Sequence, residues 1–303
     1  MYVPIGGIDQ WLQISESKPD HPILLYLHGG PGGTSVPAAA AWKSWEDHFT
    51  VAHWDQRGAG RTFRKNGEIG CGPLTVDRMV TDAVEVAEFL ITHLRKPKVL
   101  LIGHSWGSAL AIHMLKRRPE LFSAFVGTGQ LVNMRQNEEY NYRRQLAQAE
   151  RLGNQEALQV LRDIGSPPFA DWSSLITLRE WADRLAEGDG DSVQPRPTPI
   201  AADFTADEVP TLLKGANFSR NQLFEELMAI DLPSLGLTFD VPIFFFEGTC
   251  DQQTPMELAK HYFANIAAPH KEFVRFEGCH HFVVMNRPEA FLRELLARVR
   301  PLL

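Results

Sequence analysis

Residues 99–107 read Val-Leu-Leu-Ile-Gly-His-Ser-Trp-Gly, and this stretch decides the fold. Its four apolar residues in a row are typical of a strand buried on both faces of a parallel sheet. The residues after Ser105 predict a helix, which must end before Pro119. A serine with glycines two residues before and after it, in a tight turn from strand to helix, exposes its hydroxyl where the helix dipole favours negative charge. We therefore predict that Ser105 is a catalytic nucleophile; the alternative is an ordinary strand-to-helix turn.

Strand-sized apolar runs occur on both sides of this motif. They are Ile23–Leu27, Thr50–Trp54, Ala124–Val126, Val241–Phe246 and Glu272–Phe276. Val76–Leu94 has apolar residues at helical spacing and predicts an amphipathic helix between two of the strands. The alternation of strands and helices predicts an α/β domain with a mostly parallel central sheet flanked by helices.

The pattern changes over residues 131–215. Strand signals disappear there, and helical patterns rich in Arg, Glu and Gln replace them. The α/β pattern then resumes. We therefore predict a core formed by residues 1–130 and 216–303, interrupted by a helical insertion at 131–215.

Composition narrows the class of protein. The chain has 303 residues, 44% hydrophobic and 22% charged, which is typical of a packed globular protein. Its formal charge of −7 and the lack of a basic run argue against a nucleic-acid partner. No apolar run approaches the roughly 20 residues that a membrane helix needs. We expect no membrane association, and because three scattered cysteines make no disulfide framework, we expect a cytoplasmic protein.

A serine nucleophile needs a base and a carboxylate that orients the base, in the chain order serine, acid, histidine. Asp251 follows the predicted strand Val241–Phe246 and is the expected acid. Thr254 comes shortly after it and is predicted to cap the next helix. His280 and His281 both lie on the loop after the last predicted strand, and the residues alone do not decide which of them is the base.

Hydrolysis of an acyl bond also needs hydrogen-bond donors for the oxyanion. The backbone N–H of Trp106 is one expected donor, because it follows the nucleophile. The glycine-rich segment after Ile23–Leu27 is expected to supply the other, from Gly29 or Gly30. The alternative for this segment is a flexible glycine loop with no catalytic part.

Three segments together resemble the signature series of the proline iminopeptidase family of α/β-hydrolases. They are His28-Gly29-Gly30-Pro31-Gly32, the segment Trp54–Thr62 that contains Asp-Gln-Arg-Gly, and Gly103-His104-Ser105-Trp106-Gly107. The similarity is clear over residues 20–130, moderate over 240–300 and weak in the insertion. It implies an α/β-hydrolase fold in which the insertion is a helical cap over the active site.

The resemblance also implies roles for individual residues. It selects His281 as the base, because Pro288-Glu289 begins seven residues later, as in the family. It implies that Asp55 and Arg57 brace the site. Family members hold the substrate's amino group with acidic residues near the cap, but the corresponding stretch here, residues 214–219, has no carboxylate.

The candidates for substrate binding lie in or next to the insertion. Glu138 and Glu139 could replace the missing acid, although acids on helix surfaces are usually only solvated. Trp172, Trp181 and Phe218 could line an apolar pocket, or they could form the core of the cap itself. We expect no metal and no other cofactor, because neither a metal-ligand spacing nor a phosphate-binding loop is present.

The sequence therefore predicts a serine hydrolase that cleaves an ester or amide bond in a small molecule or short peptide, such as the bond of an N-terminal prolyl or aminoacyl group. The alternatives are a small-molecule carboxylesterase and a non-catalytic ligand-binding protein on the same scaffold.

Overall fold

The structure is a computed structural model that describes residues 1–16, 18–188 and 205–303. The strands of its sheet are β1 (Tyr2–Ile5), β2 (Ile8–Ile14), β3 (Ile23–Leu27), β4 (Thr50–Asp55), β5 (Val99–His104), β6 (Phe122–Thr128), β7 (Ile243–Gly248) and β8 (Lys271–Phe276). The α-helices are α1 (Gly60–Cys71), α2 (Val76–Leu94), α3 (Trp106–Arg117), α4 (Met134–Arg151), α5 (Gln155–Ile164), α6 (Trp172–Gly188), α7 (Val209–Met228), α8 (Met256–Asn265), α9 (Val283–Asn286) and α10 (Pro288–Glu294). Shorter or irregular helical segments are η1 (Val36–Asp47), η2 (Pro119–Leu121), η3 (Ala206–Glu208), η4 (Leu232–Leu235), η5 (Leu295–Val299) and η6 (Arg300–Leu302).

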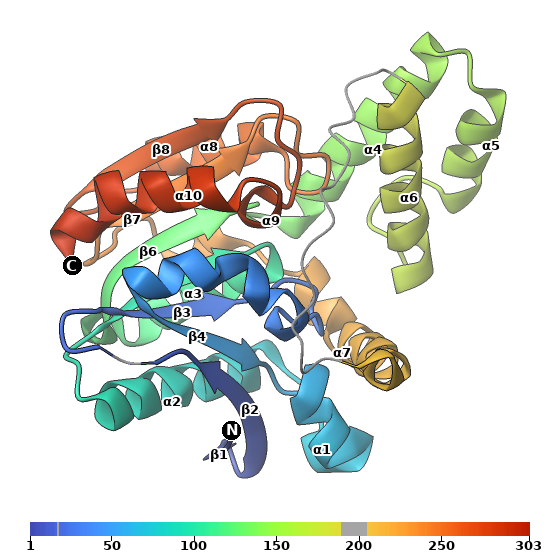
Figure 1. Cartoon of the computed structure of the whole chain (residues 1–303). Helices are drawn as coiled ribbons and strands as arrows, with labels where there is room; N and C mark the ends of the chain where they lie inside the picture. The colour runs from blue at the N-terminus through green and yellow to red at the C-terminus, as the bar shows by residue number, and fades with distance from the viewer. Residues whose placement is uncertain (17, 189–204) are drawn as a thin grey trace.

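The sheet has the strand order β1-β2-β4-β3-β5-β6-β7-β8. β1 and β2 are antiparallel to their neighbours. The remaining strands, which follow in the order β4-β3-β5-β6-β7-β8, all run parallel to one another (Figure 1). The predicted mostly parallel sheet is therefore confirmed. The prediction missed β1 and β2, which lie at one edge, where half-buried positions dilute the apolar signal.

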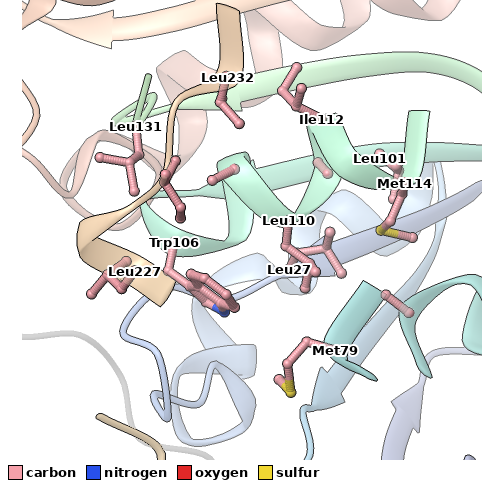
Figure 2. Packing of buried hydrophobic residues seen from close by; sticks show 14 of the residues in the cluster. Leu27, Met79, Leu101, Trp106, Leu110, Ile112, Met114, Leu131, Leu227 and Leu232 are labelled. Atoms are coloured by element: carbon pink, nitrogen blue, oxygen red, sulfur yellow. The ribbon is translucent and has the colours of Figure 1, made fainter. Parts of the chain in front are cut away.

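Alternate residues of the central strands face two separate cores, as the period of a strand requires. Leu25 and Leu101 face the side covered by α2, α3 and α8, whereas Leu24 and Leu100 face the side covered by η1 and α10. Figure 2 shows the first of these cores, in which Leu101 lies close to Met114 of α3. Burial on both faces explains why these strands read as continuous apolar runs.

The register of the sheet brings distant loops together. β3 and β5 pair in parallel with Leu27 opposite Gly103, so the glycine-rich loop and the turn at Ser105 leave the same edge of the sheet side by side. β7 and β8 pair in parallel with Gly248 opposite Phe276, so the loops that carry the predicted acid and base do the same. The site is thus assembled at the carboxyl ends of parallel strands.

Helices α4 to α6 lie beyond these strand ends, apart from the sheet (Figure 1). They belong to the predicted insertion at 131–215, of which residues 189–204 lie outside the described part of the chain. Helix α7 runs through the predicted boundary at residue 215 without interruption. None of the helices in the described residues has both the length and the apolar character needed to cross a membrane.

Candidate active site

Ser105 lies in the turn between β5 and α3, with a φ of 54° and a ψ of −122°. A positive φ is uncommon for a residue with a side chain and must be held in place by its surroundings. The turn is also crowded: a Cβ on Gly103 would lie 2.5 Å from the Gly107 oxygen, and a Cβ on Gly107 would lie 2.2 Å from the Leu27 oxygen. Both positions therefore require glycine, as the motif predicts, and Ser105 is held at the N-terminus of α3.

The glycine-rich loop lies directly beside this serine. A Cβ on Gly29 would lie 3.1 Å from the Cβ of Ser105. Gly30 has a φ of 130°, and a Cβ there would lie 2.8 Å from the nitrogen of Gly32, so the loop can take this path only with glycine. The Gly29–Gly30 segment therefore lies next to Ser105, and both line the same cavity as Trp106.

Gln56 ties this loop to the nucleophile turn. Its Nε2 donates to the His28 oxygen at 3.1 Å, and its Oε1 accepts from Nε1 of Trp106 at 3.0 Å. The Gln56 backbone N–H donates to Nε2 of His28 at 3.2 Å. Burial lowers the pKa of His28 to about 4, so the ring is neutral at pH 7 and can accept this bond.

Asp55 and Arg57 hold the same segment in position. Arg57 is buried and its Nε donates to Asp82 at 2.6 Å, while Asp55 accepts from the backbone N–H of Arg61 at 2.8 Å. Asp55 also accepts a hydrogen bond from Thr34 in the glycine-rich loop. These contacts agree with the bracing role that the resemblance implies.

The structure brings His281 to Asp251. Nδ1 of His281 lies 2.8 Å from Oδ2 of Asp251, and both side chains are buried. Oδ1 of Asp251 accepts from the backbone N–H groups of Gln253 at 2.7 Å and Thr254 at 2.9 Å. Burial alone would raise the pKa of Asp251, but the His281 ring and these N–H donors outweigh it and lower the pKa below its ordinary value. The Asp251 carboxyl is therefore ionised at neutral pH.

Thr254 has a different place from the one predicted. Helix α8 begins at Met256 with Pro255 at its cap, and the Thr254 side chain does not cap it. The Thr254 hydroxyl instead donates to Oδ2 of Asp251 at 2.9 Å and lies 3.1 Å from Nδ1 of His281. The prediction of a capping threonine was wrong because the buried carboxylate competes for the same hydroxyl.

Ser105 and His281 line one cavity of about 350 Å³. Gly29, Gly30 and Trp106 line it too, so the residues predicted from three distant parts of the chain meet at one place. Among the hydrogen bonds of the described residues, none joins the Ser105 hydroxyl to His281. In enzymes without substrate such bonds are often long and tighten only in the reacting complex.

A sequence profile of the α/β hydrolase fold family matches residues 22–288. The chain belongs to the α/β hydrolase family. It is 31% identical over 304 residues to the probable aminopeptidase YbaC of Bacillus subtilis, an alignment that covers 98% of this chain and 94% of the relative. It is 30% identical over 128 residues to the proline iminopeptidase of Neisseria gonorrhoeae, covering 42% of this chain and 39% of the relative.

The fold is shared with solved structures over nearly the whole chain. The proline iminopeptidase of Mycobacterium smegmatis superposes with a TM-score of 0.69 at 20% identity, covering 99% of this chain and 97% of that one. The predicted α/β-hydrolase fold and the similarity to proline iminopeptidases are thus confirmed, and the chain is a hydrolytic enzyme of this family.

The predicted substrate-binding residues of this α/β hydrolase do not gather in one place. Trp172 lines the cavity, but Trp181 is buried away from it and Phe218 packs on Phe63 of α1, at 5.6 Å between ring centres. Glu139 forms an ion pair with Arg135 at 3.1 Å on the surface of α4. The described wall of the cavity includes Trp172 but none of the other four candidates.

Glu138 is fully buried rather than solvated, and it pairs with Arg179 of α6. Burial raises its pKa, and the charge of Arg179 partly opposes that rise. The expectation that such helix acids are usually solvated does not apply to Glu138, because its partner is 41 residues away and invisible to a local pattern. Arg179 itself lines the cavity, as does Arg220 of α7; neither had a signal in the sequence.

Proposed function

We propose that this α/β hydrolase is a serine hydrolase that cleaves an ester or amide bond of a small molecule or short peptide. His281 takes the proton of the Ser105 hydroxyl, and the Ser105 oxygen attacks the carbonyl carbon of the substrate. The Trp106 N–H and an N–H of the Gly29–Gly30 segment stabilise the oxyanion. His281 then gives the proton to the leaving group, and water hydrolyses the acyl-enzyme by the same steps.

One observation carries this proposal. The imidazole of His281 has its Nδ1 on a buried carboxylate at 2.8 Å and lines the same cavity as a serine held at a helix N-terminus. The carboxylate fixes the tautomer that leaves Nε2 available to accept a proton, and it stabilises the imidazolium that forms. A binding protein without catalysis has no use for this arrangement.

We also propose that the insertion at 131–215 acts as a cap, together with the rest of α7. Residues from both parts, including Met134, Trp172 and Leu227, line the cavity that contains Ser105. The cap therefore forms the part of the wall that selects substrates. Its apolar side chains suit a substrate with an apolar body.

An aminopeptidase is the second candidate, favoured by the name of the relative from Bacillus subtilis. Recognition of a free amino group needs a carboxylate, and the described wall of the cavity contains no Asp or Glu. A carboxylesterase or amidase without amino-group recognition fits this wall better.

Replacement of the nucleophile tests the proposal. We expect Ser105→Ala to lower kcat/KM for p-nitrophenyl esters by several orders of magnitude and to abolish labelling by a fluorophosphonate probe. Ser44→Ala, at an exposed serine of η1, is the control and should change neither. Prolyl and acyl arylamides assayed beside the esters separate the two candidates. Labelling of Ser105→Ala at the wild-type rate would show that another residue is the nucleophile.

A further inference from the structure

Arg220, like Arg179, is a charged residue in the wall of the cavity. It belongs to α7, and its guanidinium carbon lies 5.3 Å from the ring centre of Trp172 on α6. Both residues line the cavity that contains Ser105. This cation–π contact with Trp172 positions the guanidinium in the cavity wall.

The hydrogen-bonding capacity of Arg220 is not filled. Its Nε is inaccessible to solvent and has no hydrogen-bond partner in the described part of the chain. Burial lowers the pKa of the guanidinium, and no nearby acid among the described residues opposes that effect. The side chain as a whole is half-buried, and only its Nη groups can meet a molecule in the cavity. A ligand that fills the cavity would remove water from this cation, so it must supply a hydrogen-bond partner of its own.

Arg179 provides the contrast within the same cavity. It forms an ion pair with the buried Glu138, and its Nη1 donates to the main-chain oxygen of Gln253 at 3.0 Å. The positive charge of Arg179 is therefore balanced inside the protein. The charge of Arg220 has no such balance, since no Asp or Glu occurs in the described cavity wall.

The position of Arg220 relative to Ser105 is fixed by the residues before it. The Ser219 hydroxyl donates to the Gly58 oxygen at 2.8 Å, next to the segment that braces the glycine-rich loop. A Cβ on Gly32 would lie only 2.8 Å from the Cα of Ala216, so α7 packs directly on that loop. Arg220 is thus held at a set distance from the reacting bond, as a specificity-determining group must be.

We propose that Arg220 binds a carboxylate of the substrate. The substrate class is then an ester or amide with an apolar body and a carboxylate, located in the acyl part or in the leaving group. A guanidinium fits a carboxylate through parallel N–H donors, and the apolar residues Leu131, Met134 and Leu175 suit the body between the two groups. This inference depends on the proposed hydrolase function and excludes a preference for a free amino group, which Arg220 would repel.

The test uses esters that differ only in charge. Monomethyl adipate, methyl hexanoate and methyl 6-aminohexanoate all have a six-carbon acyl chain, which ends in a carboxylate, a methyl group and an ammonium respectively. The pair 4-acetoxybenzoate and phenyl acetate places the carboxylate in the leaving group instead. We expect the wild type to favour one of the two carboxylate substrates over its uncharged match by roughly 10-fold or more in kcat/KM. The pair that shows the preference tells which side of the bond faces Arg220.

Arg220→Gln should reduce this preference by roughly 10-fold, and Arg220→Lys by less. Arg184→Gln is the matched control, because Arg184 also stacks on a tryptophan of the insertion, Trp181, at 5.0 Å, but does not line the cavity. It should leave the preference unchanged. An unchanged preference in Arg220→Gln, or a wild type that favours the ammonium or uncharged ester, overturns the inference.

A binding measurement on the wild type gives a check that needs no variant. Glutarate should inhibit hydrolysis of methyl hexanoate with a Ki roughly 10-fold below that of glutaramide. Equal Ki values would contradict the inference. If Ser105→Ala abolishes hydrolysis but the wild type shows no preference for a carboxylate substrate, only the role of Arg220 is wrong. If Ser105→Ala remains active, the proposed hydrolase mechanism is wrong as well.

Discussion

Arg179 of α6 donates from Nη1 to the main-chain oxygen of Gln253, 3.0 Å away, and Gln253 follows the proposed catalytic acid by two residues. The same oxygen accepts from Nδ2 of Asn137 at 2.7 Å and of Asn141 at 2.9 Å, both on α4. The helical insertion therefore contacts the active site twice. It lines the cavity, and it also holds the loop that carries Asp251.

Loss of the buried ion pair should destabilise this connection. We expect Arg179→Met to lower the free energy of unfolding by about 3 kcal/mol, because it leaves the fully buried Glu138 without its cation. Arg135→Met is the control: its pair with Glu139 lies on the surface of the same insertion, and we expect a change of no more than about 0.5 kcal/mol. Urea denaturation measures both, and equal losses would contradict a special role for the buried pair.

Thr254 should contribute to catalysis through Asp251 and His281, although it would not contact the reacting atoms. Thr254→Val removes the hydroxyl that donates to Oδ2 of Asp251 at 2.9 Å, and we expect kcat to fall by about 10-fold with little change in KM. Thr177→Val is the control, at a half-buried threonine of α6 whose hydroxyl donates to the Ser173 oxygen of the same helix. A rise in KM without a fall in kcat would mean that Thr254 acts on substrate binding instead.

Much of the core could be predicted from the sequence because its signals are local. Ile23–Leu27 and Val76–Leu94 have the same bounds in the structure as in the prediction, since an unbroken apolar run and a helical apolar spacing each report burial directly. Asp251 was expected from chain order, and the structure adds that His281 is the histidine bonded to it. Neighbouring histidines cannot be told apart without the direction of each side chain.

The cavity wall could not be predicted, because it depends on contacts between segments far apart in the chain. Glu138 and Arg179 are 41 residues apart, and either one alone looks like a solvated helix residue. Arg220 lies on a helix with other polar residues, and only the packing of α7 against the glycine-rich loop turns it toward the cavity. Binding residues of this kind need coordinates.

Stability should decrease as the pH falls below about 6.5, the ordinary pKa of histidine. Burial lowers the pKa of His53 to about 3 and that of His104 to about 3, so the folded protein holds both rings neutral. The unfolded chain takes up these protons at a higher pH than the folded chain does. The stabilisation is therefore fully present at a pH above the pKa that these histidines have in the unfolded chain. It is lost as the pH falls toward the pKa that they have in the folded protein.

His53→Gln tests this pH dependence. Between pH 7 and 5 the wild type should lose about 2 kcal/mol more of its free energy of unfolding than the variant, because the variant has no proton to bind at this position. His261→Gln, at an exposed histidine of α8, is the control and should follow the wild-type curve. Parallel curves for wild type and His53→Gln would show that His53 does not contribute.

The contact between α7 and the glycine-rich loop should be essential for activity, and two glycines with nearly the same positive φ allow a matched test. Gly32 has a φ of 80° and Gly7 a φ of 81°, so alanine at either position brings the same backbone strain, about 1 kcal/mol. A Cβ on Gly32 would lie 2.8 Å from the Cα of Ala216 and from the Cβ of Ser219, whereas nothing lies within 4 Å of a Cβ on Gly7. Gly32→Ala must therefore move α7 or the loop.

We expect Gly7→Ala to lose about 1 kcal/mol of stability and to keep its kcat/KM. Gly32→Ala should lose a further 1–3 kcal/mol, as overpacking does, and its kcat/KM should fall by about 100-fold, because displacement of the loop would move the proposed oxyanion donors beside Ser105. Thermal unfolding and ester hydrolysis measure the two effects. If Gly32→Ala kept the activity of Gly7→Ala, the packing of α7 on the loop would have no part in holding the donors in place.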